Sequence, residues 1–223
     1  MTIEKWYRRL AEVPRIGYEP DPSIDRTKLP GHDAVPRIHR YEFDGKQHES
    51  LDWPMKDGTT SASPSQSWET KPRRGESECK TTLRQMREAL ELPGKLSDYH
   101  FAIQNCHNSL KGFAREEPWV LEEVERLCWL DIRLISEYPE IITPEPINIA
   151  DEELAKIATA RRGERRFAAV LAFHQLMGMY EREGYLREAL EVAKIAERFE
   201  QCSGKVEEIL ERLDRIDAEA TTV

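Results

Sequence analysis

This sequence of 223 residues lacks long hydrophobic runs. Its longest apolar stretch, near residues 167–173, falls far short of the roughly 20 residues that a helix needs to cross a bilayer. The N-terminal residues also lack the basic start and apolar core of a secretory signal. We therefore expect a cytoplasmic protein with no membrane partner.

Cysteine is scarce and widely spaced. The four cysteines form no Cys-x-x-Cys pair and stand at Cys79, Cys106, Cys128 and Cys202. A disulfide framework is not expected in a reducing compartment, and a structural zinc site needs ligands in closer pairs. Cysteine at helical spacing behaves as a small apolar residue, so the sequence predicts buried thiols.

Recognisable catalytic motifs are missing as well. The sequence contains no His-Glu-x-x-His motif, phosphate-binding glycine loop, dinucleotide glycine fingerprint or nucleophile elbow. We therefore predict no catalytic residue, no metal ligand and no cofactor, and the sequence favours a protein that is not an enzyme.

Two histidines keep one alternative open. His100 and His107 are seven residues apart and so share one face of a helix. A metal site there would need a third ligand from a facing helix, such as Glu122, Glu125 or Asp131. We favour surface or groove-lining histidines, and a metal-binding protein or enzyme that uses this helix face is the alternative hypothesis.

Charge is divided unevenly along the chain. Residues 1–95 hold 17 Lys/Arg and 16 Asp/Glu, and residues 96–223 hold 16 and 26. The acidic half repels phosphate backbones, so nucleic acid is not the favoured partner. A regulator that contacts nucleic acid would have to use the basic islands Lys71–Arg74 and Arg161–Arg166, which we interpret first as solvated surface.

Proline separates the chain into two parts. Nine of the 13 prolines precede residue 95, and each restricts the backbone to extended or turn conformations. We predict a Pro-rich, largely irregular segment at 1–79 and an α-helical domain at 80–223. Within the first part, helical spacing predicts a short helix at 2–11, and composition predicts a flexible linker at 57–67.

A β-hairpin is predicted at residues 37–52. Asp44-Gly45 lies between two short runs, and Asp-Gly favours the type I′ turn of a two-residue hairpin loop. That register pairs apolar with apolar and basic with acidic residues, each pair worth about 0.2–1 kcal/mol. The pairs are Ile38 with Leu51, Arg40 with Glu49 and Arg37 with Asp52.

Helical periodicity becomes almost continuous after residue 80. Thr82 and Gln85 form a predicted capping box for the first helix of this part. Pro118 fits the first position of a later helix, whose apolar stripe runs to Pro139. A further short helix is expected at 151–162, ended by a glycine.

A more specific pattern begins at Phe173. The first apolar stripe and the facing stripe are separated by Gly184, where a left-handed turn costs glycine little. The spaced residues are Phe173, Leu176, Tyr180, Gly184, Ala189 and Ala196. These intervals resemble one degenerate tetratricopeptide repeat, over about residues 170–203.

The resemblance implies an array of helix pairs. Phe173 replaces the usual Trp, Met177 the usual Gly and Ala193 a usual aromatic residue, and no second copy of the pattern is found. Earlier helix pairs are expected to supply the neighbours that a single hairpin needs, and an amphipathic helix at 206–216 is expected to cap the array. The predicted fold is mainly α: antiparallel helical hairpins with a C-terminal capping helix and a long irregular N-terminal segment that carries one small β-hairpin.

The same resemblance implies a ligand groove on the first helix of the pair. The matching residues, with two arginines just upstream, are Leu171, His174, Gln175, Gly178, Glu181, Arg182, Arg161 and Arg165. Such a polar, amphipathic surface suits an extended peptide, and arginine binds carboxylates well. The favoured function is a non-enzymatic protein-binding scaffold or adaptor whose partner is another protein or a peptide segment.

Overall fold

A computed structural model describes residues 9–29, 37–43, 45–55, 58–61, 72–143 and 166–221. The chain divides into two compact units, Met1–Tyr138 and Pro139–Val223. The fold is mainly helical with a small antiparallel sheet, and none of the described helices is long and apolar enough to span a membrane. The boundary between the two compact units, after Tyr138, therefore lies well beyond residue 80, where the sequence changes from irregular to helical.

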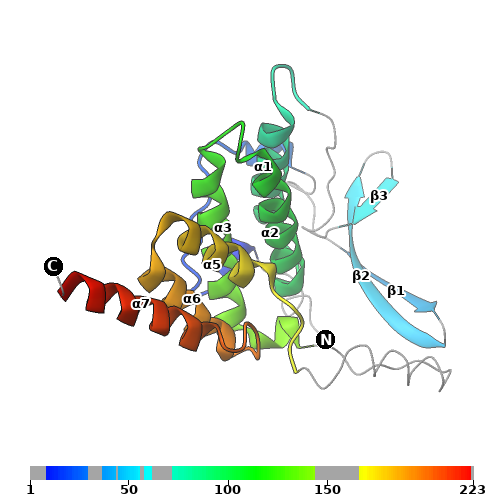
Figure 1. Ribbon diagram of the computed structural model, residues 1–223. Coiled ribbons are helices and arrows are strands. Elements are labelled where there is room, and N and C mark those ends of the chain that lie inside the picture. Colours follow the sequence, from blue (N-terminus) through cyan, green and yellow to red (C-terminus); the bar gives the residue numbers. More distant parts are fainter. Residues whose placement is uncertain are drawn as a thin grey trace. The chain divides into compact units, whose positions relative to one another are not determined.

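Three helices form the main body of the first unit (Figure 1). They are α1 (Glu78–Leu90), α2 (Leu96–Leu110) and α3 (Val120–Glu137), and α2 packs against both of the others. Apolar side chains at helical spacing are buried on α2 and α3, because they lie on the face that meets the neighbouring helix. They include Tyr99, Ile103, Leu110, Val124 and Leu127.

The predicted helix starts need two corrections. The first helix begins at Glu78, because the Ser77 hydroxyl accepts a hydrogen bond from the backbone N–H of Lys80, so the Thr82 capping box is wrong. The third helix begins at Val120, and Pro118 lies in the turn that precedes it.

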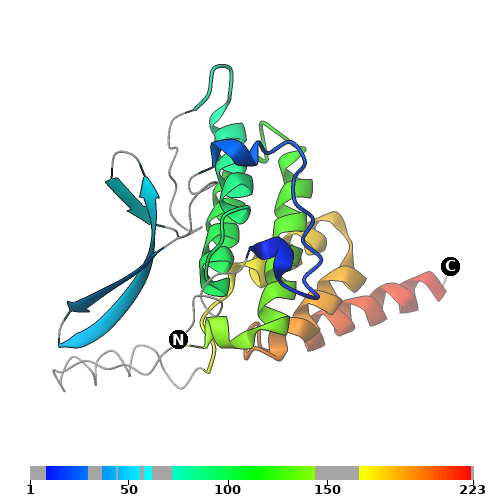
Figure 2. The same ribbon diagram turned by 180° about the vertical axis from the view of Figure 1, so that it is seen from behind.

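Residues 9–29, named here the strap, run over α1 and α3 (Figure 2). The strap contains two 3-10 turns, Leu10–Glu12 and Arg26–Lys28, and buries Leu10, Val13 and Ile16. The helix predicted at 2–11 lies mostly outside the described residues, and its described end is only the first of these turns. The strap has no helical or strand periodicity, and it is held in place because its buried side chains insert between the helices of the first unit.

A three-stranded antiparallel sheet also belongs to the first unit. Its strands are β1 (Arg37–Phe43), β2 (Lys46–Met55) and β3 (Gly58–Ser61), in the order β1-β2-β3. The predicted hairpin register is confirmed at all three pairs: Ile38 with Leu51, Arg40 with Glu49, and Arg37 with Asp52. Gly45 has φ +68°, as the turn requires.

The flexible linker predicted at 57–67 is wrong for residues 58–61. These four residues pair with the end of β2, where Trp53 lies opposite Thr60 and Met55 opposite Gly58. Short polar residues resemble a linker by composition, but two β-branched threonines suit a strand once a neighbour supplies the hydrogen bonds. The remainder of 57–67 lies outside the described residues.

The second unit contains α5 (Leu171–Glu183), α6 (Leu186–Glu197) and α7 (Lys205–Thr221), preceded by a 3-10 turn at Pro139–Ile142. α5 and α6 pack as an antiparallel pair, and α7 packs on α6 (Figure 1). Gly184 ends α5 with φ +83°, so the predicted glycine turn between two helices is confirmed. The helix predicted at 151–162 lies outside the described residues.

An aromatic cluster and an amide clasp hold the second unit together. Phe173 is fully buried, and its ring centroid lies 5.8 Å from that of Phe199. The side chain of Gln201 accepts a hydrogen bond from the Val170 N–H at 2.9 Å and donates one to the Ala168 carbonyl at 2.9 Å. The segment before α5 is therefore tied to the loop after α6.

The two glycines of the α5 segment give a matched stability test. We expect Gly184→Ala to destabilise the protein by about 1–2 kcal/mol, because alanine is strained at φ +83°. Gly178→Ala should instead stabilise it by about 0.5–1 kcal/mol, because Gly178 lies inside α5 with open space where a Cβ would stand. Thermal unfolding followed by circular dichroism measures both changes, and shifts of the same sign would contradict the turn.

Candidate functional site

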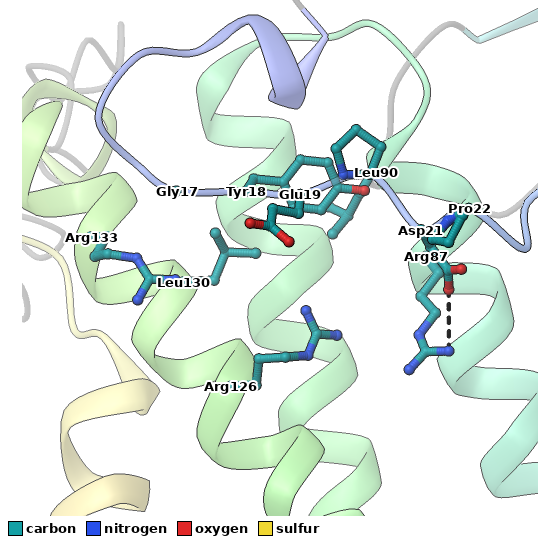
Figure 3. Close-up of a pocket in the computed structure, with 11 residues that line it drawn as sticks. Gly17, Tyr18, Glu19, Asp21, Pro22, Arg87, Leu90, Arg126, Leu130 and Arg133 are labelled. Atoms are coloured by element: carbon teal, nitrogen blue, oxygen red, sulfur yellow. Dashed lines mark ion pairs between the residues drawn. The ribbon is translucent and has the colours of Figure 1, made fainter.

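A cleft of about 330 Å³ lies between the strap and the helices α1 and α3 (Figure 3). We name it the arginine cleft, because three arginines line it together with apolar and acidic side chains. Its lining residues are Gly17, Tyr18, Glu19, Pro20, Asp21, Pro22, Arg87, Leu90, Arg126, Leu130 and Arg133. All of them belong to the first unit.

Helix α3 supplies a row of three of these side chains. Arg126, Leu130 and Arg133 are spaced four and three residues apart, so they follow one face of the helix (Figure 3). The Arg133 Nε donates a hydrogen bond to the Ile16 carbonyl at 2.8 Å. Within the described part of the chain, the two Nη groups of Arg133 have no protein acceptor, so they remain available to a bound anion.

The other two arginines already have acidic neighbours. Glu123 accepts hydrogen bonds from Arg87 at 2.8 Å and from Arg126 at 2.8 Å. Arg87 also pairs with Asp21 of the strap at 3.2 Å. These pairs orient Arg87 and Arg126, and they leave Arg133 as the arginine whose charge has no acidic partner among the described residues.

The pKa shifts in the cleft reflect burial and the charges of its arginines. Burial and then the positive charge of Arg126 lower the pKa of the Arg133 guanidinium. Burial alone would raise the pKa of Asp21, but hydrogen bonds from Ser23 and the charges of Arg87 and Arg126 outweigh it and lower that pKa. An anion placed between Arg126 and Arg133 would offset the repulsion between them.

Glu91 holds the strap in place beside the cleft. The Tyr18 hydroxyl donates a hydrogen bond to Glu91 at 2.9 Å, and Arg26 donates another at 2.8 Å. Burial, followed by the charge of Glu91 and this hydrogen bond, raises the pKa of Tyr18 well above its ordinary value, so the hydroxyl stays protonated and keeps donating. The wall of the cleft is therefore fixed by the C-terminal end of α1.

A second hollow of about 630 Å³ lies beside Ser23–Leu29, and its arginines differ in one respect. Arg73 pairs with Glu88 at 2.7 Å, and Arg84 pairs with Glu76 at 2.7 Å and with Glu88 at 3.0 Å. A bound anion there would have to displace these carboxylates. The arginine cleft is the better anion site because Arg133, unlike Arg73 and Arg84, has no acidic partner among the described residues.

The groove residues predicted on α5 do not lie on one open surface. Gln175 is buried, whereas Leu171, His174 and Arg182 are exposed and Gly178 is half-buried. Gly178 leaves open space beside the helix, because among the described residues no atom outside the adjoining stretch of α5 lies within 4 Å of the place where a Cβ would stand. Arg161 and Arg165 lie outside the described residues.

Helix α7 engages the middle of the predicted groove. Glu181 accepts a hydrogen bond from Lys205 at 3.4 Å and lies 3.7 Å from an Arg212 nitrogen. The Cys202 sulfur lies 3.8 Å from a ring nitrogen of His174. Two of the predicted groove residues therefore contact α7 or the loop that leads to it.

The prediction that His100 and His107 lie on the surface or in a groove is wrong, because both side chains are buried. His100 Nδ1 lies 2.7 Å from Asp131 Oδ1, so one suggested third ligand does face it. Within the ranges that the structure describes, however, no three His, Cys, Asp or Glu side chains are grouped to hold a metal ion. Of the four cysteines, Cys202 is half-buried and the other three are buried.

Sequence reasoning did not find the arginine cleft. Its signal was present, because Arg126 and Arg133 are two helical turns apart with Leu130 between them. Comparison with protein-family models, curated proteins and solved structures gives no match to this chain. Function is therefore inferred from the geometry and chemistry of its own residues.

Proposed function

We propose that this chain is a non-enzymatic helical adaptor that binds an acidic segment of another protein in the arginine cleft. The observation that carries the proposal is Arg133, whose guanidinium is oriented through Nε by the Ile16 carbonyl and whose two Nη groups have no acceptor among the residues that the structure describes. A guanidinium oriented in this way is suited to hydrogen bonding with a carboxylate.

A protein segment suits the cleft better than a small inorganic anion. Leu130 lies between Arg126 and Arg133 on α3 (Figure 3), and Leu90, Tyr18 and two prolines also line the cleft. An inorganic anion would leave this apolar surface in water, whereas a peptide can cover it while its carboxylates meet the arginines. The mixed lining therefore favours a chain that carries both acidic and apolar side chains.

The second unit adds a separate part to the proposed adaptor. The α5–α6 pair with Gly184 at its turn is taken as a tetratricopeptide-like hairpin, and such hairpins bind extended segments. Leu171, His174 and Arg182 are the exposed residues of its predicted groove. In the proposal this face is a secondary contact, because Glu181 is already engaged by α7.

Binding of acidic peptides tests the proposal. The probe is a fluorescein-labelled mixture of nonapeptides, each containing two glutamates, two prolines and one leucine in varied order, followed by fluorescence anisotropy. We expect Arg126→Glu/Arg133→Glu to weaken binding at least about 10-fold, because each charged hydrogen bond contributes about 1.5–3 kcal/mol. The same mixture with glutamine in place of glutamate should bind the wild-type chain as weakly.

The matched control is Arg74→Glu/Arg115→Glu, which changes the net charge equally at two exposed arginines outside the cleft. It should leave the affinity within about twofold of wild type. A third variant, Arg182→Glu, tests the α5 face. Equal losses in the control and the cleft variant, or a loss only in Arg182→Glu, would contradict binding in the cleft.

A further inference from the structure

The spacing of the two α3 arginines determines how far apart two acidic residues of a bound segment must lie. Arg126 and Arg133 are seven residues apart, which is about 10.5 Å along a helix. In a polyproline II segment, residues three positions apart lie on the same side and are separated by about 9 Å. In a flat β-strand, residues three positions apart point to opposite faces, so their side chains could not both contact Arg126 and Arg133.

The wall of the cleft has the same backbone preference. Pro20 and Pro22 fix their own φ angles, and each restricts the residue before it to extended or polyproline II conformations. The strap therefore crosses α3 as an extended, proline-bearing chain with acids at Glu19 and Asp21. The strap thus shows that an extended, proline-bearing chain can pack against this face of α3.

We propose that the arginine cleft selects a polyproline II segment that carries two acidic residues three positions apart, with an apolar residue between them. The first acid meets the Nη groups of Arg133, and the second meets the Nη group of Arg126 that Glu123 does not hold. The apolar residue between them, which the threefold helix turns to one side of the row, meets the apolar lining of the cleft (Figure 3). This specificity depends on the proposed function, because it names the segment that the cleft of the adaptor would hold.

The two acidic residues of the strap that line the cleft, Glu19 and Asp21, have different effects on a bound acidic segment. Asp21 is committed to Arg87 and to the hydroxyl and N–H groups of Ser23. Glu19 is exposed at the rim of the cleft and lowers its positive charge. Glu19→Gln should therefore tighten binding of an acidic segment about two- to fivefold while it leaves the preferred spacing unchanged.

Three labelled nonapeptides of identical composition test the spacing. GSEPLEPSG has its glutamates three positions apart, GSEPEPLSG has them two apart, and GSEPLPSEG has them five apart. We expect the full-length chain to bind GSEPLEPSG at least about fivefold more tightly than the other two. The variant Arg126→Gln/Arg133→Gln should bind all three peptides equally weakly, because the two guanidinium groups that distinguish the glutamate spacings are lost.

The outcomes separate the two proposals. If all three peptides bind equally well and more tightly than GSQPLQPSG, the spacing rule is overturned and the adaptor proposal is supported. If no glutamate peptide binds more tightly than GSQPLQPSG, both are overturned. A preference for GSEPLEPSG that persists in Arg126→Gln/Arg133→Gln would show that other residues read the segment, which also overturns the inference.

Discussion

Replacing His100 by leucine is expected to destabilise the first unit by about 3–5 kcal/mol. His100 is 2 % exposed and Asp131 is fully buried, and their Nδ1 and Oδ1 atoms are 2.7 Å apart. The other carboxylate oxygen of Asp131 has no hydrogen-bond partner in the described part of the chain. Removing the histidine would leave the whole carboxylate buried without this donor, which is costly because a buried polar group without a hydrogen-bond partner does not recover its lost hydration.

The double variant His100→Leu/Asp131→Leu separates the loss of the pair from the loss of packing. Two apolar residues in place of a buried pair often restore stability, so this variant should unfold much closer to wild type than the single variant. Urea unfolding followed by tryptophan fluorescence reports on this unit, because all five tryptophans precede residue 139. A single variant as stable as the double would contradict a stabilising contact between His100 and Asp131.

Phe173→Ala is expected to destabilise the second unit by about 3–5 kcal/mol. The Phe173 side chain is fully buried against Phe199, and its removal leaves a cavity between α5 and the end of α6. Because this unit contains no tryptophan, far-ultraviolet circular dichroism during urea unfolding is the suitable measurement. The loss should appear as a lower midpoint for part of the helical signal.

Leu210→Ala is the control for that variant. Leu210 is on α7 and is 41 % exposed, so its truncation should cost less than about 1 kcal/mol. Equal losses in Leu210→Ala and Phe173→Ala would show that Phe173 does not stand at the centre of this core.

The β-hairpin was predictable because its pairing is specified locally. Asp-Gly fixes a two-residue loop, and the two-residue period of a strand then leaves one register in which Ile38 meets Leu51 and Arg40 meets Glu49. The α5–α6 turn was predictable for a similar reason, since Gly184 follows directly on one apolar stripe and precedes another. Short-range signals settled both elements.

The strap and β3 were missed because long-range partners determine them. Tyr18 meets Glu91, which is 73 residues further along the chain, and no periodicity in a proline-bearing segment indicates such a partner. Thr60 belongs to a strand only because Trp53 lies opposite it. The composition of a segment does not indicate which distant residues it will contact.

The candidate site was missed for a related reason. Arginines such as Arg126 and Arg133 on an amphipathic helix are most often solvated, and here the strap turns their face into a cleft. The burial of His100 likewise depends on Asp131, which comes from a different helix. In both places the residue types were visible in the sequence, but their surroundings were not.

The contacts of Glu91 have a consequence for shortened forms of the protein. This carboxylate is almost buried at the end of α1, and its cation Arg26 and its hydroxyl donor Tyr18 both come from the strap. A chain that starts after residue 29 would lose one side of the arginine cleft, uncover the surface under Leu10 and Ile16, and leave Glu91 without its guanidinium and hydroxyl partners. Such a truncation would not yield a stable minimal domain, because the strap supplies the hydrogen-bond and ion-pair partners of a carboxylate on the helical body.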